Sequence, residues 1–176
     1  MFSRLFKNKE QHPPDPGADE QYLKLRNLIL GLDSDQLDFP DPQNIPRVWG
    51  ALIDIGLPEL RFTVVSLADV DQTTSVYAGG GAARIGYGAH PKVAELSSAL
   101  LEVADRCAKD MTPATSFPLP AIGRVRFYVF TSTGKLMADR SLDELDVQRD
   151  DFSLLYRISG SIITEVRVIS EEWQKE

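Results

Sequence analysis

The sequence predicts an α+β protein in which an antiparallel sheet of two hairpins carries packed helices. Segments rich in β-branched and aromatic residues come in pairs that short polar turns join, as in hairpins. Segments with apolar residues at helical spacing separate and flank these pairs, which gives the order α-β-β-α-β-β-α. Alternating strand–helix–strand units, which would indicate a doubly wound parallel sheet, do not occur in this order.

The 176 residues, 43% of them hydrophobic, suit one domain with a modest extension. We expect a flexible N-terminal segment over 1–17, which includes the proline-rich QHPPDPG, and a helix over 18–32. A single α+β domain is expected to occupy residues 44–172. Whether the 18–32 helix packs on that domain stays open at this point.

The predicted elements follow from local patterns. After the first helix, Asn44 is a plausible cap for a second helix, which Gly56 and Pro58 would end. Strands are expected over 60–68 and from Thr73, and a helix from Pro91 to about Asp110. A second hairpin, an acidic loop and a last helix complete the domain, with a strand as the alternative for the β-branched residues 161–169.

Charge and cysteine content narrow the function classes. The net charge of −7 argues against binding to nucleic acid and to anionic membranes. The single cysteine, Cys107, excludes an internal disulfide and fits a cytoplasmic location. No apolar run approaches the ~18 residues of a spanning helix. Phe2, Leu5 and Phe6 offer a weak membrane contact, with a frayed terminus as the alternative.

Five glycines fall within the fifteen residues YAGGGAARIGYGAHP, directly before a predicted helix. Such glycines can expose backbone N–H groups to an anion at a helix N-terminus. One alternative is structural: a strand bulge followed by a turn with positive φ angles. A flexible partner-binding loop is the other alternative. Neither the P-loop pattern nor the dinucleotide-binding pattern is complete here. The candidate ligand-binding residues are Gly79, Gly80, Gly81, Arg84, Gly86, Gly88 and His90.

Catalytic and metal chemistry find no support in the residue spacing. Cys107 and His90 would lie about 25 Å apart on one helix, which rules out a nucleophile–base pair. Two histidines and one cysteine at these spacings do not indicate a zinc site. We therefore expect no enzyme, no cofactor and no metal.

Two surfaces are candidates for a protein partner. In the strand RVRFYVF, basic and aromatic side chains share one face, which favours either a partner-binding surface or a strand covered on both faces. The acidic stretch after it could dock a basic partner or be a solvated loop. The residues in question are Arg124, Arg126, Tyr128, Phe130, Asp143, Glu144 and Asp146.

The chain also shows two resemblances to known proteins. The runs VWGALIDIGLP, GGG, a helix that starts at HP, and FPLPAIGRVRFYVF resemble an uncharacterised bacterial protein family, which implies no activity. The element order is similar to that of roadblock/LC7 and profilin-like domains, which implies dimers that act as scaffolds. We expect a protein-binding or self-associating adaptor. A binder or enzyme of an anionic small molecule through residues 79–90, and an immunity protein against a basic toxin, are the alternatives.

Overall fold

The computed structural model describes residues 18–173, without the side chains of the last two. The expectations for residues 1–17, Phe2, Leu5 and Phe6 included, lie outside this range. The helices are α1 Glu20–Leu30, α2 Pro91–Cys107, α3 Leu142–Val147 and α4 Asp151–Trp173, with short 3-10 turns at Ser34–Gln36, Tyr87–Ala89 and Ala108–Asp110. The strands are β1 Val48–Gly56, β2 Arg61–Leu67, β3 Thr74–Ala78, β4 Ala83–Arg84, β5 Thr112–Pro113, β6 Arg124–Thr131 and β7 Gly134–Ser141.

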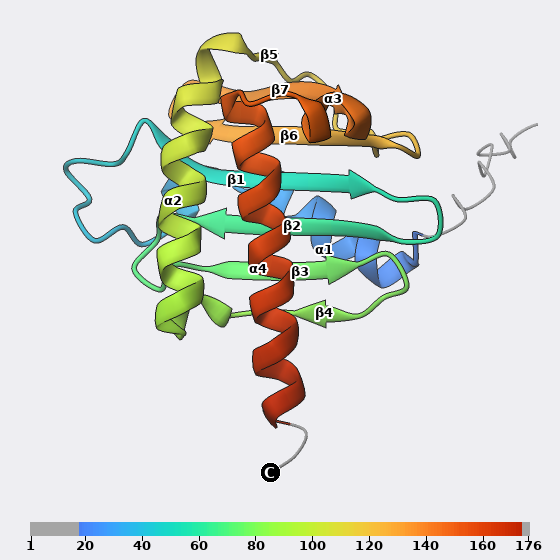
Figure 1. The fold of residues 1–176 in the computed structure, drawn as a ribbon. Coiled ribbons are helices and arrows are strands. Elements are labelled where there is room, and N and C mark those ends of the chain that lie inside the picture. The colour runs from blue at the N-terminus through green and yellow to red at the C-terminus, as the bar shows by residue number, and fades with distance from the viewer. Residues whose placement is uncertain (1–17, 174–176) are drawn as a thin grey trace, which may run out of the picture.

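The fold is α+β with an antiparallel sheet, as the sequence predicts. The described strands form one seven-stranded sheet in the order β4-β3-β2-β1-β6-β7-β5. Helices α2 and α4 run side by side across one face, and α1 lies on the other (Figure 1). Strand β1 occupies the middle of the sheet, between β2 and β6.

The helix predicted from Asn44 to Gly56 is wrong, because residues 48–56 form the central strand β1. All nine of its residues are buried. A strand covered on both faces shows no alternation of apolar and polar residues, so its pattern resembles that of a buried helix. Gly56 does not end a helix: a Cβ there would lie 2.5 Å from the Ala121 carbonyl oxygen, so glycine permits a close backbone approach. Pro58 lies in the β1–β2 turn, which a bond from the Leu57 N–H to the Leu60 carbonyl closes.

The C-terminal part of the chain settles two further expectations. Residues 161–169 are helical, since α4 is continuous from Asp151 to Trp173. The predicted acidic loop contains the short helix α3, which Ser141 and Glu144 begin with a reciprocal capping box. The order α-β-β-α-β-β-α is therefore incomplete, since β1 to β4 form a meander before α2.

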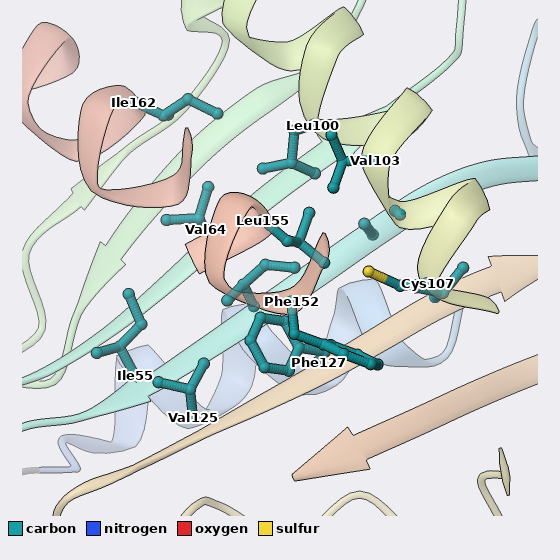
Figure 2. Packing of buried hydrophobic residues seen from close by; sticks show 14 of the residues in the cluster. Ile55, Val64, Leu100, Val103, Cys107, Val125, Phe127, Phe152, Leu155 and Ile162 are labelled. Carbon is teal, nitrogen blue, oxygen red and sulfur yellow. The ribbon is translucent and has the colours of Figure 1, made fainter. Parts of the chain in front are cut away.

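The larger core lies between the sheet and helices α2 and α4. Helix α2 contributes Leu100, Val103 and Cys107, and α4 contributes Phe152, Leu155 and Ile162. Figure 2 shows these side chains directed toward Ile55, Val64, Val125 and Phe127 of the sheet. The ring of Phe152 lies 5.3 Å from that of Phe127. These contacts fix α4 across the strands.

Helix α1 packs on the opposite face of the sheet, which answers the question that the sequence left open. It buries Tyr22, Ile29 and Leu30 in a second cluster with Trp49 and Phe130. The loop of residues 114–121 lies over the same face and contributes the half-buried Phe117 and Leu119. No helix in the described range is long and apolar enough to cross a membrane.

Candidate functional site

The first glycines of the predicted ligand stretch form the tight turn between β3 and β4. The Ala78 N–H donates to the Ala82 carbonyl at 2.8 Å, and Gly81 has a φ of +91°. This is left-handed backbone that favours glycine. Gly79 also accepts a 2.7 Å bond from the Asp19 N–H at the start of α1. These glycines thus have a conformational role in closing the hairpin.

The later glycines serve conformation and packing. Gly86 has a φ of +79°. A Cβ at Gly88 would lie 1.9 Å from the Gln72 carbonyl oxygen, so only glycine fits beside that backbone. His90 precedes α2, makes no side-chain cap bond to the helix, and stacks on Tyr87 with 5.5 Å between ring centroids. Arg84 is the one of the seven candidate residues that also lines the groove described below.

The basic and aromatic face of β6 is covered by the chain itself. Tyr128 and Phe130 are fully buried. The Tyr128 hydroxyl and the Arg126 guanidinium both donate to the Pro118 carbonyl, each at 2.9 Å. Arg124 and Arg126 both pair with Asp139. Of the two alternatives for this face, the structure shows the strand covered on both sides.

The acidic residues near the C-terminal helices have local partners. Glu144 accepts from the Ser141 N–H, which lowers the pKa of the Glu144 carboxyl. Asp150 accepts from the Ser153 N–H at 2.8 Å at the start of α4, and this bond lowers the pKa of the Asp150 carboxyl. Asp143 and Asp146 are exposed on α3. Glu144 and Asp150 thus contribute to helix formation.

Cys107 is enclosed in the core. Burial, with a contribution from Asp151, raises the pKa of the Cys107 thiol to about 12. A thiol in this state is a poor nucleophile near neutral pH. Within residues 18–173, no group of three or more histidine, cysteine or acidic side chains is placed to hold a metal ion.

A groove of about 240 Å³ lies between the C-terminal half of α4 and the edge of the sheet at β4. Strands β2 and β3 supply its apolar floor, and α4 supplies one wall. The hairpin side chains Ala78 and Ala82 are small and leave this space open. The lining residues are Phe62, Val76, Ala78, Ala82, Arg84, Ile163, Thr164, Val166, Arg167 and Ser170.

The groove exists because α4 is longer than the sheet is wide. Strand β4 contains only Ala83 and Arg84 and forms one edge of the sheet. Figure 1 shows the last turns of α4 running past β4. Val166 is buried against the sheet, whereas the exposed residues Thr164 and Arg167 form the outer rim of the groove. The space beside β4 is thus bordered by a helix without a further strand beneath it.

The charges in the groove are both positive. Among the described residues, its lining contains Arg84 and Arg167 and no acidic side chain, although the whole chain carries a net charge of −7. Arg167 pairs with Glu171 only at 3.9 Å, and both side chains are more than 60% exposed. Arg84 donates from its guanidinium to the carbonyl of its neighbour Ala83 at 3.2 Å. The groove therefore suits a ligand that combines apolar groups with a negative charge.

Sequence reasoning finds Arg84 but misses the other groove residues. Arg167 and Val166 lie far from Arg84 in the sequence, and only the path of α4 across the sheet brings them to the same hollow. The available signal is the length of the apolar pattern in α4, which continues to Ile169 and exceeds what a short sheet can cover.

Comparisons of the chain with family models, with curated proteins and with solved structures found no match. The likeness to roadblock and profilin-like domains stays a prediction, since no solved structure matches. A function for this protein has to be argued from its own groove.

Proposed function

We propose that this protein is a non-enzymatic binding module that holds an extended segment of a partner protein alongside β4, beneath the end of α4. The observation that supports this proposal is the run of the last turns of α4 past the edge strand β4 (Figure 1). Addition of a peptide strand to an open sheet edge is a common mode of recognition, in which backbone bonds supply affinity and side-chain pockets supply specificity.

The backbone N–H and C=O groups of β4 are oriented as strand addition requires. Paired residues of antiparallel strands alternate between those that bond to each other and those whose N–H and C=O point outward. The Ala78 N–H donates to the Ala82 carbonyl, and Tyr77 pairs with Ala83 in the next position. The N–H and C=O of Ala83 therefore point away from β3, toward the open edge.

The groove would hold apolar side chains of the added strand. Alternate residues of a strand point to the same face, so every second residue of the segment would project toward the α4 face of the sheet, beside Arg84 at the edge of the groove. Full burial of one Val or Leu side chain contributes about 1.5–3 kcal/mol. The gain from two such residues and a few backbone bonds exceeds the cost of association by a small margin, so we expect weak binding.

The test uses a fluorescent peptide, TVTETVT, which places two valines and a glutamate on one strand face. Fluorescence anisotropy should show saturable binding to the protein. Thr164→Trp, which fills the groove from its rim, should weaken binding at least about tenfold. Ser161→Trp, at an exposed position of α4 that lines a different hollow with Lys92 and Leu96 of α2, is the matched control and should bind normally.

A second variant tests the backbone mechanism. Ala83→Pro removes an N–H that faces the open edge, and it breaks no hydrogen bond to β3. Edge positions whose N–H points outward tolerate proline, so the fold should be kept. We expect it to lose peptide binding while its circular dichroism spectrum stays unchanged. Unaltered peptide binding by Ala83→Pro would contradict strand addition.

The same groove could receive a strand from a second copy of this chain or an anionic small molecule. Light scattering of the protein alone reports the first, since a dimer lost in Ala83→Pro would identify a second copy as the occupant. Stabilisation by phosphorylated metabolites, without peptide binding, would support the second and contradict our proposal.

A further inference from the structure

The Arg84 side chain hydrogen-bonds to the outward-facing carbonyl of Ala83, which an incoming strand would need as an acceptor. Its guanidinium donates to the Ala83 carbonyl at 3.2 Å. That carbonyl faces the open edge, as the alternation of the β3–β4 pair requires. An exposed edge strand is a template for unwanted pairing, and a side chain that caps its backbone reduces this hazard.

We propose that Arg84 makes the edge of β4 selective for acidic segments, because a carboxylate of the ligand draws its guanidinium away and frees the Ala83 carbonyl. This inference rests on strand addition as the proposed function. Guanidinium–carboxylate bonds are charge-assisted and stronger than a bond to a neutral carbonyl. An acidic residue of the segment thus forms a bond with Arg84 and exposes the acceptor for the N–H of the ligand backbone.

The direction of the Arg84 side chain places this exchange in the groove. Arg84 pairs with Val76 across the β3–β4 ladder, so both side chains lie on the α4 face of the sheet. The ligand residue that meets Arg84 would therefore share a face with the apolar residues that fill the groove. This predicts a motif in which an acidic residue lies two positions from an apolar one.

Arg167 reinforces the selectivity from the opposite wall. Its only described carboxylate partner is Glu171 at 3.9 Å, an exposed pair that contributes little. In the described part of the lining, a negative ligand therefore meets two cationic groups and no acidic side chain, and a basic segment is repelled.

The test compares TVTETVT with the neutral peptide TVTQTVT. Wild-type protein should bind the acidic peptide about tenfold more tightly, and high salt should reduce the difference. Arg84→Ala should abolish most of this preference in a specific way: binding of TVTETVT weakens, whereas binding of TVTQTVT tightens, because the Ala83 carbonyl is no longer occupied. Arg157→Ala, an exposed arginine on α4 outside this groove, is the control and should match wild type.

The outcomes separate this inference from the proposed function. Equal binding of both peptides by wild type, or weaker binding of TVTQTVT by Arg84→Ala, would overturn the role of Arg84 and leave strand addition standing. Failure of both peptides to bind any variant would overturn strand addition and this inference with it.

Discussion

The buried ion pair that holds α1 against the sheet gives a specific prediction about stability. Arg26 on α1 and Asp54 on β1 form an ion pair with 2.7 Å between Nη2 and Oδ2, and their side chains are only 2% and 0% exposed. The Thr63 hydroxyl donates to Asp54 at 2.6 Å, and the Arg26 guanidinium also donates to the Pro118 carbonyl. One ion pair thus joins α1, the centre of the sheet and the loop of residues 114–121.

Arg26→Met removes the cation that pairs with the buried Asp54 carboxylate, while Arg61 still contributes a positive charge nearby. Removal of one partner from a buried pair costs about 3–5 kcal/mol, which is a large fraction of the stability of a small domain. Urea unfolding followed by circular dichroism measures this loss. Arg47→Met is the control: it breaks the Arg47–Asp105 pair, whose side chains are 65% and 45% exposed, and should cost less than about 1 kcal/mol.

The pH dependence of the Arg26→Met variant gives a second readout. Burial raises the pKa of the Asp54 carboxyl, and the positive charge of Arg26 opposes that rise. Without Arg26 the folded-state pKa rises further, so the protonated acid stabilises the fold at low pH and this stability is lost as pH rises. The stability deficit should therefore shrink as pH falls from neutral.

A double variant completes this test. Arg26→Met combined with Asp54→Asn removes the buried carboxylate charge as well and should be more stable than Arg26→Met alone at neutral pH. The reasoning is refuted if Arg26→Met costs no more than Arg47→Met, or if the double variant gains nothing.

Three further predictions concern the glycines, the thiol and a helix cap. Gly88→Ala should lower the unfolding free energy by about 1–3 kcal/mol in thermal melts, because its Cβ would clash with the Gln72 carbonyl. The control Gly80→Ala has open space around its Cβ and should change the unfolding free energy by less than about 0.5 kcal/mol. Equal effects of the two variants would contradict the packing role of Gly88. Cys107 should resist iodoacetamide at about pH 8 in the native protein and react in urea. The raised pKa of its thiol contributes stability to the fold below the ordinary pKa near 9, and this stability is lost as pH rises toward about 12. Rapid labelling of the native protein, measured by mass spectrometry, would refute the burial of Cys107. Asp150→Ala should lower the unfolding free energy by about 1 kcal/mol at neutral pH, because it removes the helix cap. The pKa of the Asp150 carboxyl is lowered, so its contribution to stability is present above its ordinary pKa and should vanish as pH falls below ~4. A pH-independent difference from wild type in urea unfolding would argue against the cap.

Local patterns predict most of the elements. The helices α2 and α4 are recognisable because their apolar residues keep a helix period. The β6–β7 hairpin is recognisable because its β-branched and aromatic residues stand beside a turn. Strand β1 resembles a helix in the sequence because both of its faces are buried, so its run of apolar residues carries no period. Gly56 and Pro58 then imitate a helix end, although they serve a close backbone approach and a turn.

The candidate groove is harder to predict for a geometric reason. Arg84 stands out beside the glycines, but its partner Arg167 comes from a helix whose direction is fixed by the core, through residues such as Phe152 and Ile162. The pairing of Arg84 with the Ala83 carbonyl depends on the hairpin register, which a single sequence does not give.

Amide hydrogen exchange at Ala83, followed by NMR with and without saturating TVTETVT, reports directly on the addition of a peptide strand to β4. Strand addition predicts that the Ala83 N–H, which faces the open edge, becomes strongly protected when the peptide is bound, because it then donates to the peptide backbone. Unchanged exchange at Ala83 in the saturated complex would contradict strand addition and place the peptide elsewhere on the protein.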